Sequence, residues 1–494
     1  MYRKIFKGTS FLSAAEVVSQ GCALVRNMIL ARFLAKADFG VAALLGMVLT
    51  LFELSGKLAL SQQVIQSKHG DDPKFISSVQ FSQFAAGTLS ALLILLAAWP
   101  LAHFFSGPQY FTSILALALI PFISGMNNLD VYRFARRLAF GPLVLVDTIP
   151  QVISTLAAWP LAIFFKDYRA VLVLLLGKAL FSTAITHLLA EHRFSMKFNA
   201  HWLRESVKFS WPLLLNGFIQ IGNFQGDSMV VAASFPLAQL GIYSVAMTIA
   251  MAPNLTIMRI SSSLGLPLLA EVQNDPPRFT ARYSQLVQTM ALVGSIVIVG
   301  MMLCGEQVVM LLFGSKYAGV GALACWLTAS QSMRVLRAST TIAAMARGDT
   351  INNLISSSWR LSGLLLAIMV GILKASITWF AVAALMGEII ALSATIIRLK
   401  SKHSIAPKRT ILPAAVGVMC VVFTGGIKLL LSPGQHPFFN WLFLPVAVLL
   451  NVGAFTLCFA ELRTVMIDLN RRLRMKLGWQ VTNTLPAFSG DLKD

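Results

Sequence analysis

Charged and amide side chains recur at helical spacing inside two apolar segments of this chain. The first stripe consists of Glu16, Gln20, Arg26 and Asn27. The second consists of Asn216, Gln220, Asn223 and Asp227. Within each stripe the spacing places the side chains on one face of an α-helix. Such a face can line a hydrated cavity, where amides bind hydroxyl groups and charged groups bind an ion of opposite sign.

Further cations lie inside other apolar segments, among them Arg259, Arg334, Arg337 and Arg360. An ionised side chain at the centre of a bilayer costs about 2.5–3.5 kcal/mol, so each one needs an explanation. Because cations outnumber anions, we predict a net positive cavity that holds an anionic substrate. Its predicted cations are Arg26, Arg259, Arg334 and Arg337, and its predicted polar contacts are Gln20, Asn27, Asn216, Gln220 and Asn223.

Structural explanations remain open for several of these groups. Glu53 and Lys57, at i and i+4, can neutralise each other within one helix. Arg334 and Arg337 can reach the interface if they lie near a segment end. The second stripe can instead hold two helices together through hydrogen bonds. The candidates for an ion-coupling group are the carboxylates Asp227, Glu16 and Glu53.

These residues belong to a strongly apolar chain of 494 residues, of which 56% are hydrophobic and 12% charged. A soluble protein carries about 25% charged residues, and the mean hydropathy here is +0.73. We therefore predict an all-α polytopic membrane protein with about fourteen transmembrane helices. The expected spans are 10–35, 39–64, 77–105, 110–135, 142–165, 169–190, 207–234, 237–265, 283–313, 319–346, 352–373, 376–397, 410–432 and 438–460.

The basic residues alternate between the two sides of this arrangement. Both tails and every second connection together carry 26 Lys and Arg, whereas the intervening connections carry six. The positive-inside rule then places both termini in the cytoplasm, in a bacterial inner membrane. Twelve spans with two re-entrant segments would fit the same asymmetry. Residues 461–494 form a predicted cytoplasmic tail, which begins as a basic amphipathic helix on the membrane surface.

An internal repeat is visible when the chain is shifted by about 200 residues. The shift pairs Gln20 with Gln220 and, after one residue of slip, Phe39-Gly40 with Leu240-Gly241. Because it moves span 1 onto span 7, both copies have the same orientation. We expect two pseudo-symmetric six-helix lobes around a central cavity, an N-lobe over 1–200 and a C-lobe over 201–400. Two extra helices then occupy 401–460.

The sequence lacks the motifs that several classes of enzyme and nucleotide-binding protein require. No G-x-x-x-x-G-K-[ST] motif is present, so we predict no ATP use, and no H-E-x-x-H motif or nucleophile elbow occurs. Connections between segments do not exceed about 20 residues, which leaves no room for a soluble catalytic domain. The charges lie in short loops, which argues against nucleic-acid binding. We predict no catalytic residue, cofactor or metal site.

Several short motifs follow one another in a fixed order along the chain. They are Val18-Ser-Gln20, Ile29-Leu-Ala-Arg-Phe-Leu34, Asp38-Phe-Gly40, Glu205-Ser-Val-Lys-Phe-Ser-Trp-Pro212 followed by Asp227, Leu240-Gly-Ile-Tyr-Ser-Val-Ala246, Leu266-Pro-Leu-Leu-Ala-Glu-Val-Gln-Asn-Asp275 and Leu312-Phe-Gly-Ser-Lys-Tyr317. In this order they resemble the polysaccharide transporter family, the Wzx-like O-antigen and exopolysaccharide flippases of the MOP exporter superfamily. The resemblance covers about residues 10–400.

The resemblance implies alternating access and export of an undecaprenyl-pyrophosphate-linked oligosaccharide. By similarity to the related flippases of lipid-linked peptidoglycan precursors, Arg26 takes the place of a cavity arginine near the pyrophosphate, and Arg259 does the same in span 8. Those flippases have Asp after this Arg, whereas Asn27 follows Arg26 here.

Two other functions are alternatives to this one. A cation-coupled multidrug exporter of the same superfamily would have an anionic, aromatic-lined pocket, and a membrane polysaccharide polymerase or ligase would have a sizeable outer loop. The expected partners are the lipid-linked oligosaccharide and membrane lipids, with a polysaccharide polymerase and co-polymerase as further candidates. We expect the protein to function as a monomer.

Overall fold

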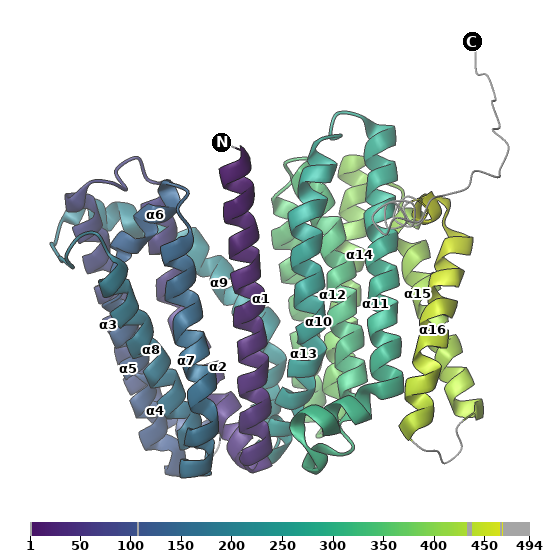
Figure 1. The fold of residues 1–494 in the computed structure, drawn as a ribbon, viewed down its shortest axis with the longest axis horizontal. Helices are drawn as coiled ribbons and strands as arrows, with labels where there is room; N and C mark the ends of the chain where they lie inside the picture. The colour runs from purple at the N-terminus through teal and green to yellow at the C-terminus, as the bar shows by residue number, and fades with distance from the viewer. Residues whose placement is uncertain (1, 106–107, 432–436, 465–466, 468–494) are drawn as a thin grey trace, which may run out of the picture.

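The structure is a computed structural model that describes residues 2–105, 108–431, 437–464 and 467 (Figure 1). Throughout these residues it contains helices and turns and no strand. The long helices are α1 (Tyr2–Phe33), α2 (Lys36–Gln66), α3 (Pro73–Phe105), α7 (Gly141–Phe165), α8 (Arg169–Leu189), α9 (Ala200–Ser234), α10 (Leu237–Ala270), α11 (Pro276–Phe313), α12 (Gly321–Ala346), α13 (Ile351–Ile372), α14 (Ile377–His403), α15 (Lys408–Leu431) and α16 (Pro437–Cys458). Short elements are η1 (Pro108–Tyr110), α4 (Phe111–Leu117), α5 (Leu119–Gly125), η2 (Leu129–Tyr132), α6 (Arg133–Arg136) and η3 (Ser315–Tyr317).

Within the described residues, ten helical segments are long and apolar enough to cross a membrane. Helices α1, α2, α9 and α12 are not among them, although they have 32, 31, 35 and 26 residues. Two of them, α1 and α9, carry the polar stripes, and α12 carries Arg334 and Arg337. The protein is a polytopic helical membrane protein, and the count of fourteen spans stays a prediction.

The two halves of the chain pack their helices in the same order. In the first half α1 packs on α7, α7 on α8, α8 on α5, α5 on α3, and α3 on α2. In the second half the corresponding contacts are α9 on α13, α13 on α14, α14 on α12, α12 on α11, and α11 on α10. This order is the structural counterpart of the repeat seen in the sequence. Helices α15 and α16 pack against α11 at one edge (Figure 1).

The two halves meet where α2 crosses α10. A Cβ atom on Gly40 would overlap the carbonyl of Leu237, and one on Gly241 would overlap the carbonyl of Lys36. Only glycine allows these backbones to approach so closely. The contact lies at the end of α1 away from the N-terminus, where Lys316 also donates to the carbonyls of Arg32 and Leu34. The halves are therefore joined at that end.

The span expected over 110–135 is wrong as one continuous helix. The apolar part ends at Gly125 and is broken at Ala118, between α4 and α5. Pro121 has no N–H to donate to the carbonyl of Leu117, which explains the break. Side chains of α3 then terminate the segment, because Gln83 donates to the carbonyl of Ser124 at 3.1 Å. The predicted tail over 461–494, with its amphipathic helix, lies largely outside the described residues.

Candidate functional site

A large cavity lies between the two halves of the molecule. It consists of two adjoining hollows of about 860 and 840 Å³, which share Asn27, Thr248 and Met251 in their walls. Helices α1, α2, α9 and α10 supply nearly all of the lining. These are the first two helices of each repeat, so the cavity lies at the interface of the two pseudo-symmetric halves.

The predicted polar face of α1 lines this cavity. Arg26 and Asn27 border the first hollow, and Glu16, Gln20 and Asn27 border the second. The face is exposed to the cavity because another side of α1 packs against α7. From the second repeat, Asn216 and Gln220 of α9 line the first hollow. With Arg259 of α10 in the second hollow, the structure therefore brings together six of the predicted substrate-binding residues, plus Glu16.

Arg26 lies in the cavity wall and has no negatively charged partner among the described residues. Its guanidinium Nη1 lies 3.4 Å from the hydroxyl of Ser154 on α7. In the described part of the chain no carboxylate forms an ion pair with it. A cation in this position attracts an anion that enters the cavity.

Arg259 lies in the wall of the second hollow and is paired across the cavity. Its Nη2 is 2.5 Å from Oε1 of Glu16, which also accepts a hydrogen bond from Gln20 at 3.0 Å. The two charged side chains are 48% and 41% exposed, so the ion pair is accessible to water and to a competing anion. The pair joins α1 of the first repeat to α10 of the second.

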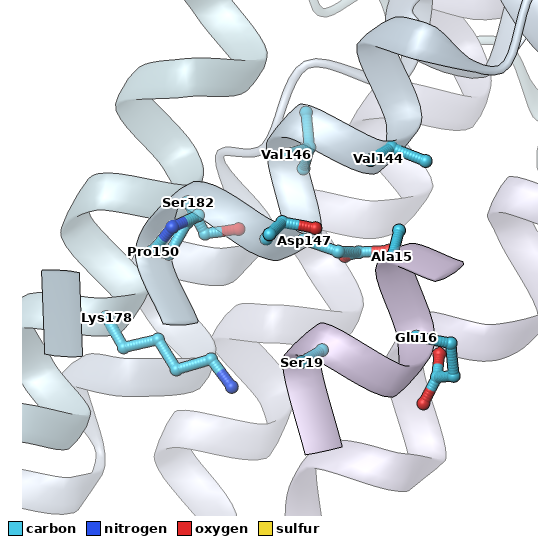
Figure 2. Close-up of a pocket in the computed structure, with 10 residues that line it drawn as sticks. Ala15, Glu16, Ser19, Val144, Val146, Asp147, Pro150, Lys178 and Ser182 are labelled. Carbon is cyan, nitrogen blue, oxygen red and sulfur yellow. The ribbon is translucent and has the colours of Figure 1, made fainter. Parts of the chain in front are cut away.

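Glu16 also faces a smaller pocket on the other side of α1 (Figure 2). This pocket of about 190 Å³ lies between α1, α7 and α8, and Asp147, Lys178 and Ser182 contribute to its wall. In Figure 2 the Glu16 carboxylate points away from Asp147 and Lys178. Glu16 is therefore positioned between a charged side pocket and the central cavity.

Arg334 and Arg337 were expected in the cavity wall, but neither of them lines either hollow. They lie in a buried ionic cluster within the second repeat. Both donate to Glu388 of α14, with N–O distances of 2.7 and 2.8 Å, and the Glu388 side chain is fully buried. Arg360 of α13 donates to the same carboxylate at 2.7 Å. Because Glu388 accepts hydrogen bonds from all three arginines, their guanidinium groups point into the helix bundle and not into the cavity.

Asp227 belongs to the same cluster and does not line the cavity. Its Oδ2 accepts from Arg360 at 2.8 Å, while its Oδ1 has no hydrogen-bond partner in the described structure. Asn223 likewise points toward α13, where its amide donates to the carbonyl of Ser357 at 3.1 Å. The cause is the packing of α9. Its stripe faces the cavity near Asn216, whereas farther along the same face meets α13.

The sequence did not reveal how closely this cluster approaches the cavity. The guanidinium carbon of Arg334 lies 4.8 Å from the ring centre of Phe224, and Phe224 is itself part of the cavity wall. One aromatic ring therefore separates the ionic cluster from the cavity. The sequence shows that Arg360 and Glu388 are charged residues inside apolar segments. It does not show which residues they pair with, because the members of the cluster lie on four different helices.

Glu53, the third carboxylate considered for ion coupling, lies away from the central cavity. It borders a small hollow between α2, α3 and α5 with Gln83 and Ser124. The hydroxyl of Ser124 is 3.5 Å from its Oε1. The side chain of Lys57, its expected partner, lies outside the described part of the structure.

The cavity also has polar residues that the sequence analysis did not select. They are Thr50 and Gln62 on α2, Gln225 and Ser228 on α9, and Ser244 and Thr248 on α10. Hydroxyl and amide groups of this kind bind sugar hydroxyls by hydrogen bonds. They escaped notice because uncharged Ser, Thr and Gln are common in apolar helices and carry no signal by themselves.

A family profile described as "Polysaccharide biosynthesis protein" matches residues 29–321, which is more than half of the chain. The protein belongs to this family. The match begins within α1 and ends at the start of α12, so it includes most of the helices that line the cavity.

The relatives with functional names include a transport protein and a lipopolysaccharide biosynthesis protein. The succinoglycan biosynthesis transport protein ExoT of Rhizobium meliloti (strain 1021) is 22% identical over 300 residues, which are 60% of each protein. The lipopolysaccharide biosynthesis protein WzxC of Escherichia coli (strain K12) is 18% identical over 324 residues, which are 64% of this chain and 65% of WzxC. The matched region thus spans less than two thirds of the length of either relative.

The fold is shared with a solved flippase. The lipid II flippase MurJ, in an inward closed conformation, superimposes with a TM-score of 0.71 at 16% identity. The superposition covers 92% of this chain and 99% of MurJ. At this identity the similarity establishes the fold, and the residues of the cavity carry the functional argument.

Proposed function

We propose that this protein is a flippase for a lipid-linked oligosaccharide, an O-antigen or exopolysaccharide repeat unit on undecaprenyl pyrophosphate. It acts by alternating access in a bacterial inner membrane, with both termini in the cytoplasm. The observation that carries the proposal is the pair of cavity arginines, Arg26 on α1 and Arg259 on α10. Amide and hydroxyl groups lie beside them in a wall that is otherwise largely apolar. The family membership and the MurJ-like fold support it.

In this mechanism the pyrophosphate binds between the two halves. Arg26 offers an uncompensated guanidinium, and the pyrophosphate displaces Glu16 from Arg259. Guanidinium groups bind phosphate oxygens in bidentate geometry. Sugars contact the amides of Gln20, Asn27, Asn216 and Gln220. Once the substrate replaces the ion pair between α1 and α10, one link between the halves at the N-terminal end is lost, and the halves can rearrange.

The cavity fits an anionic substrate better than a cationic drug. Among the described residues that line the two hollows, Glu16 in the second hollow is the one carboxylate, and Arg259 pairs with it. A cation exporter would need an available negative charge at this place. We propose Glu16, Asp227 and Glu53 as groups for ion coupling, with Glu16 first because it contacts both halves. A polysaccharide polymerase or co-polymerase remains a proposed partner, and the monomer the proposed unit.

The test is transport of a lipid-linked oligosaccharide in vesicles that contain the full-length protein. We expect Arg26→Ala and Arg259→Ala to abolish transport and the Lys variants to retain part of it, because charge matters first and geometry second. Arg278→Ala, at an exposed arginine paired with Asp275, is the matched control and should transport normally. Full transport by the Arg26→Ala/Arg259→Ala double variant would refute the proposal. Export of cationic dyes by the wild type would favour the drug exporter.

A further inference from the structure

A second polar cavity lies at the end of the first repeat where the N-terminus also lies (Figure 1). Its volume is about 290 Å³, near the lower end of small-molecule sites, which span about 300–1,000 Å³. One wall is the start of α3 and the other is the extended connection between α8 and α9. A backbone hydrogen bond of 3.2 Å from Lys197 to Ser77 holds this connection against α3. The site is separate from the transport cavity.

The floor of this cavity is an ionic cluster whose charges are satisfied internally. Arg133 lies 3.0 Å from Asp130 and 3.3 Å from Asp71. The other oxygen of Asp130 accepts from the backbone amides of Glu191 and His192 at 2.8 and 3.0 Å. Burial alone would lower the pKa of Arg133, but its hydrogen bonds to Asp130 and Asp71 raise the pKa above its usual range. The floor therefore offers no spare carboxylate to the walls.

The walls carry three cations that lack such compensation. Lys74 lies in the first turn of α3, and Arg193 and Lys197 lie on the connection. All three are exposed, and in the described part of the chain none of them forms an ion pair. Ser195 also lines the cavity, and its hydroxyl has no hydrogen-bond partner among the described residues. Three like charges around one cavity create a positive potential that favours the binding of an anion between them.

The surroundings of the cations point to a lipid as the source of the anion. Two apolar side chains of the same connection, Met196 and Phe198, are 40% and 66% exposed. The ring of Phe198 packs on Phe81 of α3, with 5.5 Å between ring centres. The connection thus alternates cations with exposed apolar groups, as segments at a membrane interface do.

We propose that Lys74, Arg193, Lys197 and Ser195 bind the phosphate of an anionic phospholipid from the adjacent leaflet. The headgroup occupies the cavity, and the acyl chains leave along Met196 and Phe198. The size of the cavity suits a headgroup and excludes a complete oligosaccharide. This site does not depend on the proposed transport function, since none of these residues lines the central cavity.

The test is native mass spectrometry of the purified full-length protein with phosphatidylglycerol, phosphatidylcholine or inorganic phosphate. The variant combines Lys74→Ala, Arg193→Ala and Lys197→Ala. The matched control combines Arg204→Ala, Lys208→Ala and Lys400→Ala, which remove the same charge from exposed residues outside the cavity. We expect about a fivefold loss of phosphatidylglycerol affinity for each cavity cation removed, and little loss in the control. Hydrogen exchange should show that this lipid protects residues 190–199.

Three outcomes would overturn the assignment. Equal losses in the variant and the control would mean that only the overall charge attracts the lipid. Binding of phosphatidylcholine as tight as that of phosphatidylglycerol would mean that the site does not select a headgroup with a net negative charge. Protection of residues 190–199 by inorganic phosphate alone, at the same concentration as the lipid, would assign the cavity to a free anion. Lipid-linked oligosaccharide transport by the variant is expected to persist, which separates this site from the proposed function.

Discussion

Arg26 and Arg259 face the same cavity in different electrostatic states. Arg26 has a hydroxyl neighbour, whereas Arg259 is held by Glu16 from the opposite half. An anionic substrate therefore binds Arg26 directly but must compete with a carboxylate for Arg259. Because both members of the pair are about half exposed, the competition costs little: exposed ion pairs contribute about 0.2–1 kcal/mol. Glu16 is thus an internal competitor that the substrate can displace.

This competition predicts the effect of Glu16→Gln. The variant removes the competing charge and keeps the size of the side chain, so we expect up to about fivefold tighter binding of a pyrophosphate-bearing lipid. The gain should shrink at high salt, which screens the pair in the wild type. Binding to the purified protein measures it, with Glu205→Gln on an exposed carboxylate as the control. An unchanged dissociation constant would show that Glu16 does not compete for Arg259.

The buried ionic cluster predicts that two carboxylate variants differ in severity. Glu388→Gln leaves Arg334 and Arg337 without a charged partner and leaves Arg360 with Asp227 alone, and removing one partner of a buried pair costs about 3–5 kcal/mol. Asp227→Asn should cost less, because its amide oxygen can still accept from Arg360. Thermal unfolding in detergent compares them. Equal destabilisation would contradict the central role of Glu388.

Asp227→Asn also tests ion coupling. If Asp227 exchanges a proton during the cycle, the variant should bind the lipid-linked substrate and no longer respond to an imposed pH gradient. Gradient-driven transport at the wild-type rate would remove Asp227 from consideration and leave Glu16 and Glu53.

At the scale of elements, the crossing of α2 and α10 holds one end of the molecule closed. Alanine is favoured over glycine in a helix by about 1 kcal/mol, yet in Gly40→Ala the new Cβ would overlap the carbonyl of Leu237. We expect the helices to separate at this end. Labelling of a cysteine at Ala43, in the cavity wall, by an impermeant reagent added outside should accelerate about tenfold for each 1.4 kcal/mol of lost closure.

The control for this prediction lies on the same helix. A Cβ on Gly46 would meet no atom within 4 Å, so Gly46→Ala should leave the labelling rate unchanged. Both variants are compared after the five natural cysteines have been replaced. Equal rates for Gly40→Ala and Gly46→Ala would show that the crossing does not control access.

The connection between α12 and α13 predicts a dependence on pH. Asp349 is buried and accepts from Arg398 at 2.9 and 3.1 Å. These hydrogen bonds hold its pKa well below the usual range, although burial opposes them. A depressed pKa stabilises the fold above the unfolded pKa of about 4, and the stabilisation is lost as pH falls below that value.

We therefore expect Asp349→Asn to lower the midpoint of thermal unfolding at neutral pH. The difference from the wild type should shrink below about pH 4, where Asp349 of the unfolded wild-type chain begins to bind a proton while the folded protein keeps its carboxylate ionised. Intrinsic fluorescence between pH 3 and pH 8 measures it. A difference that stays constant over this range would mean that the charge of Asp349 contributes nothing to stability.

Sequence reasoning succeeded or failed at these scales for physical reasons. Spacing places Glu16, Gln20 and Asn27 on one face of α1, and a helix of fixed pitch keeps them there. The spacing of residues within one helix does not predict which other helix, or which cavity, lies opposite that face. Arg334 was assigned to the cavity because its partner Glu388 is 54 residues away on another helix. The break at Ala118 was readable from Pro121, but the end of that segment depends on Gln83 of α3.

At the scale of the whole molecule, two independent patterns describe the same two-part architecture. The sequence repeat pairs Gly40 with Gly241, and in the structure these two glycines meet at the crossing of α2 and α10. The helices of both halves then pack in the same order. The repeat could be predicted because it preserves polar and small residues at matching positions. Which helices line the cavity could not, because it follows from the way the two halves dock.

The orientation in the membrane is the last prediction, and it follows from charge. Connections at the end that holds the N-terminus carry most of the Lys and Arg, including Arg193 and Lys197, whereas the connection over 166–169 carries two. The positive-inside rule then places residues 191–206 in the cytoplasm and 166–169 outside. Single cysteines in these connections, probed in intact cells with an impermeant maleimide, should react only in the second. Labelling of residues 191–206 from outside would reverse the predicted orientation, so that the end closed by Gly40 and Gly241 would face the cytoplasm and both termini would lie outside.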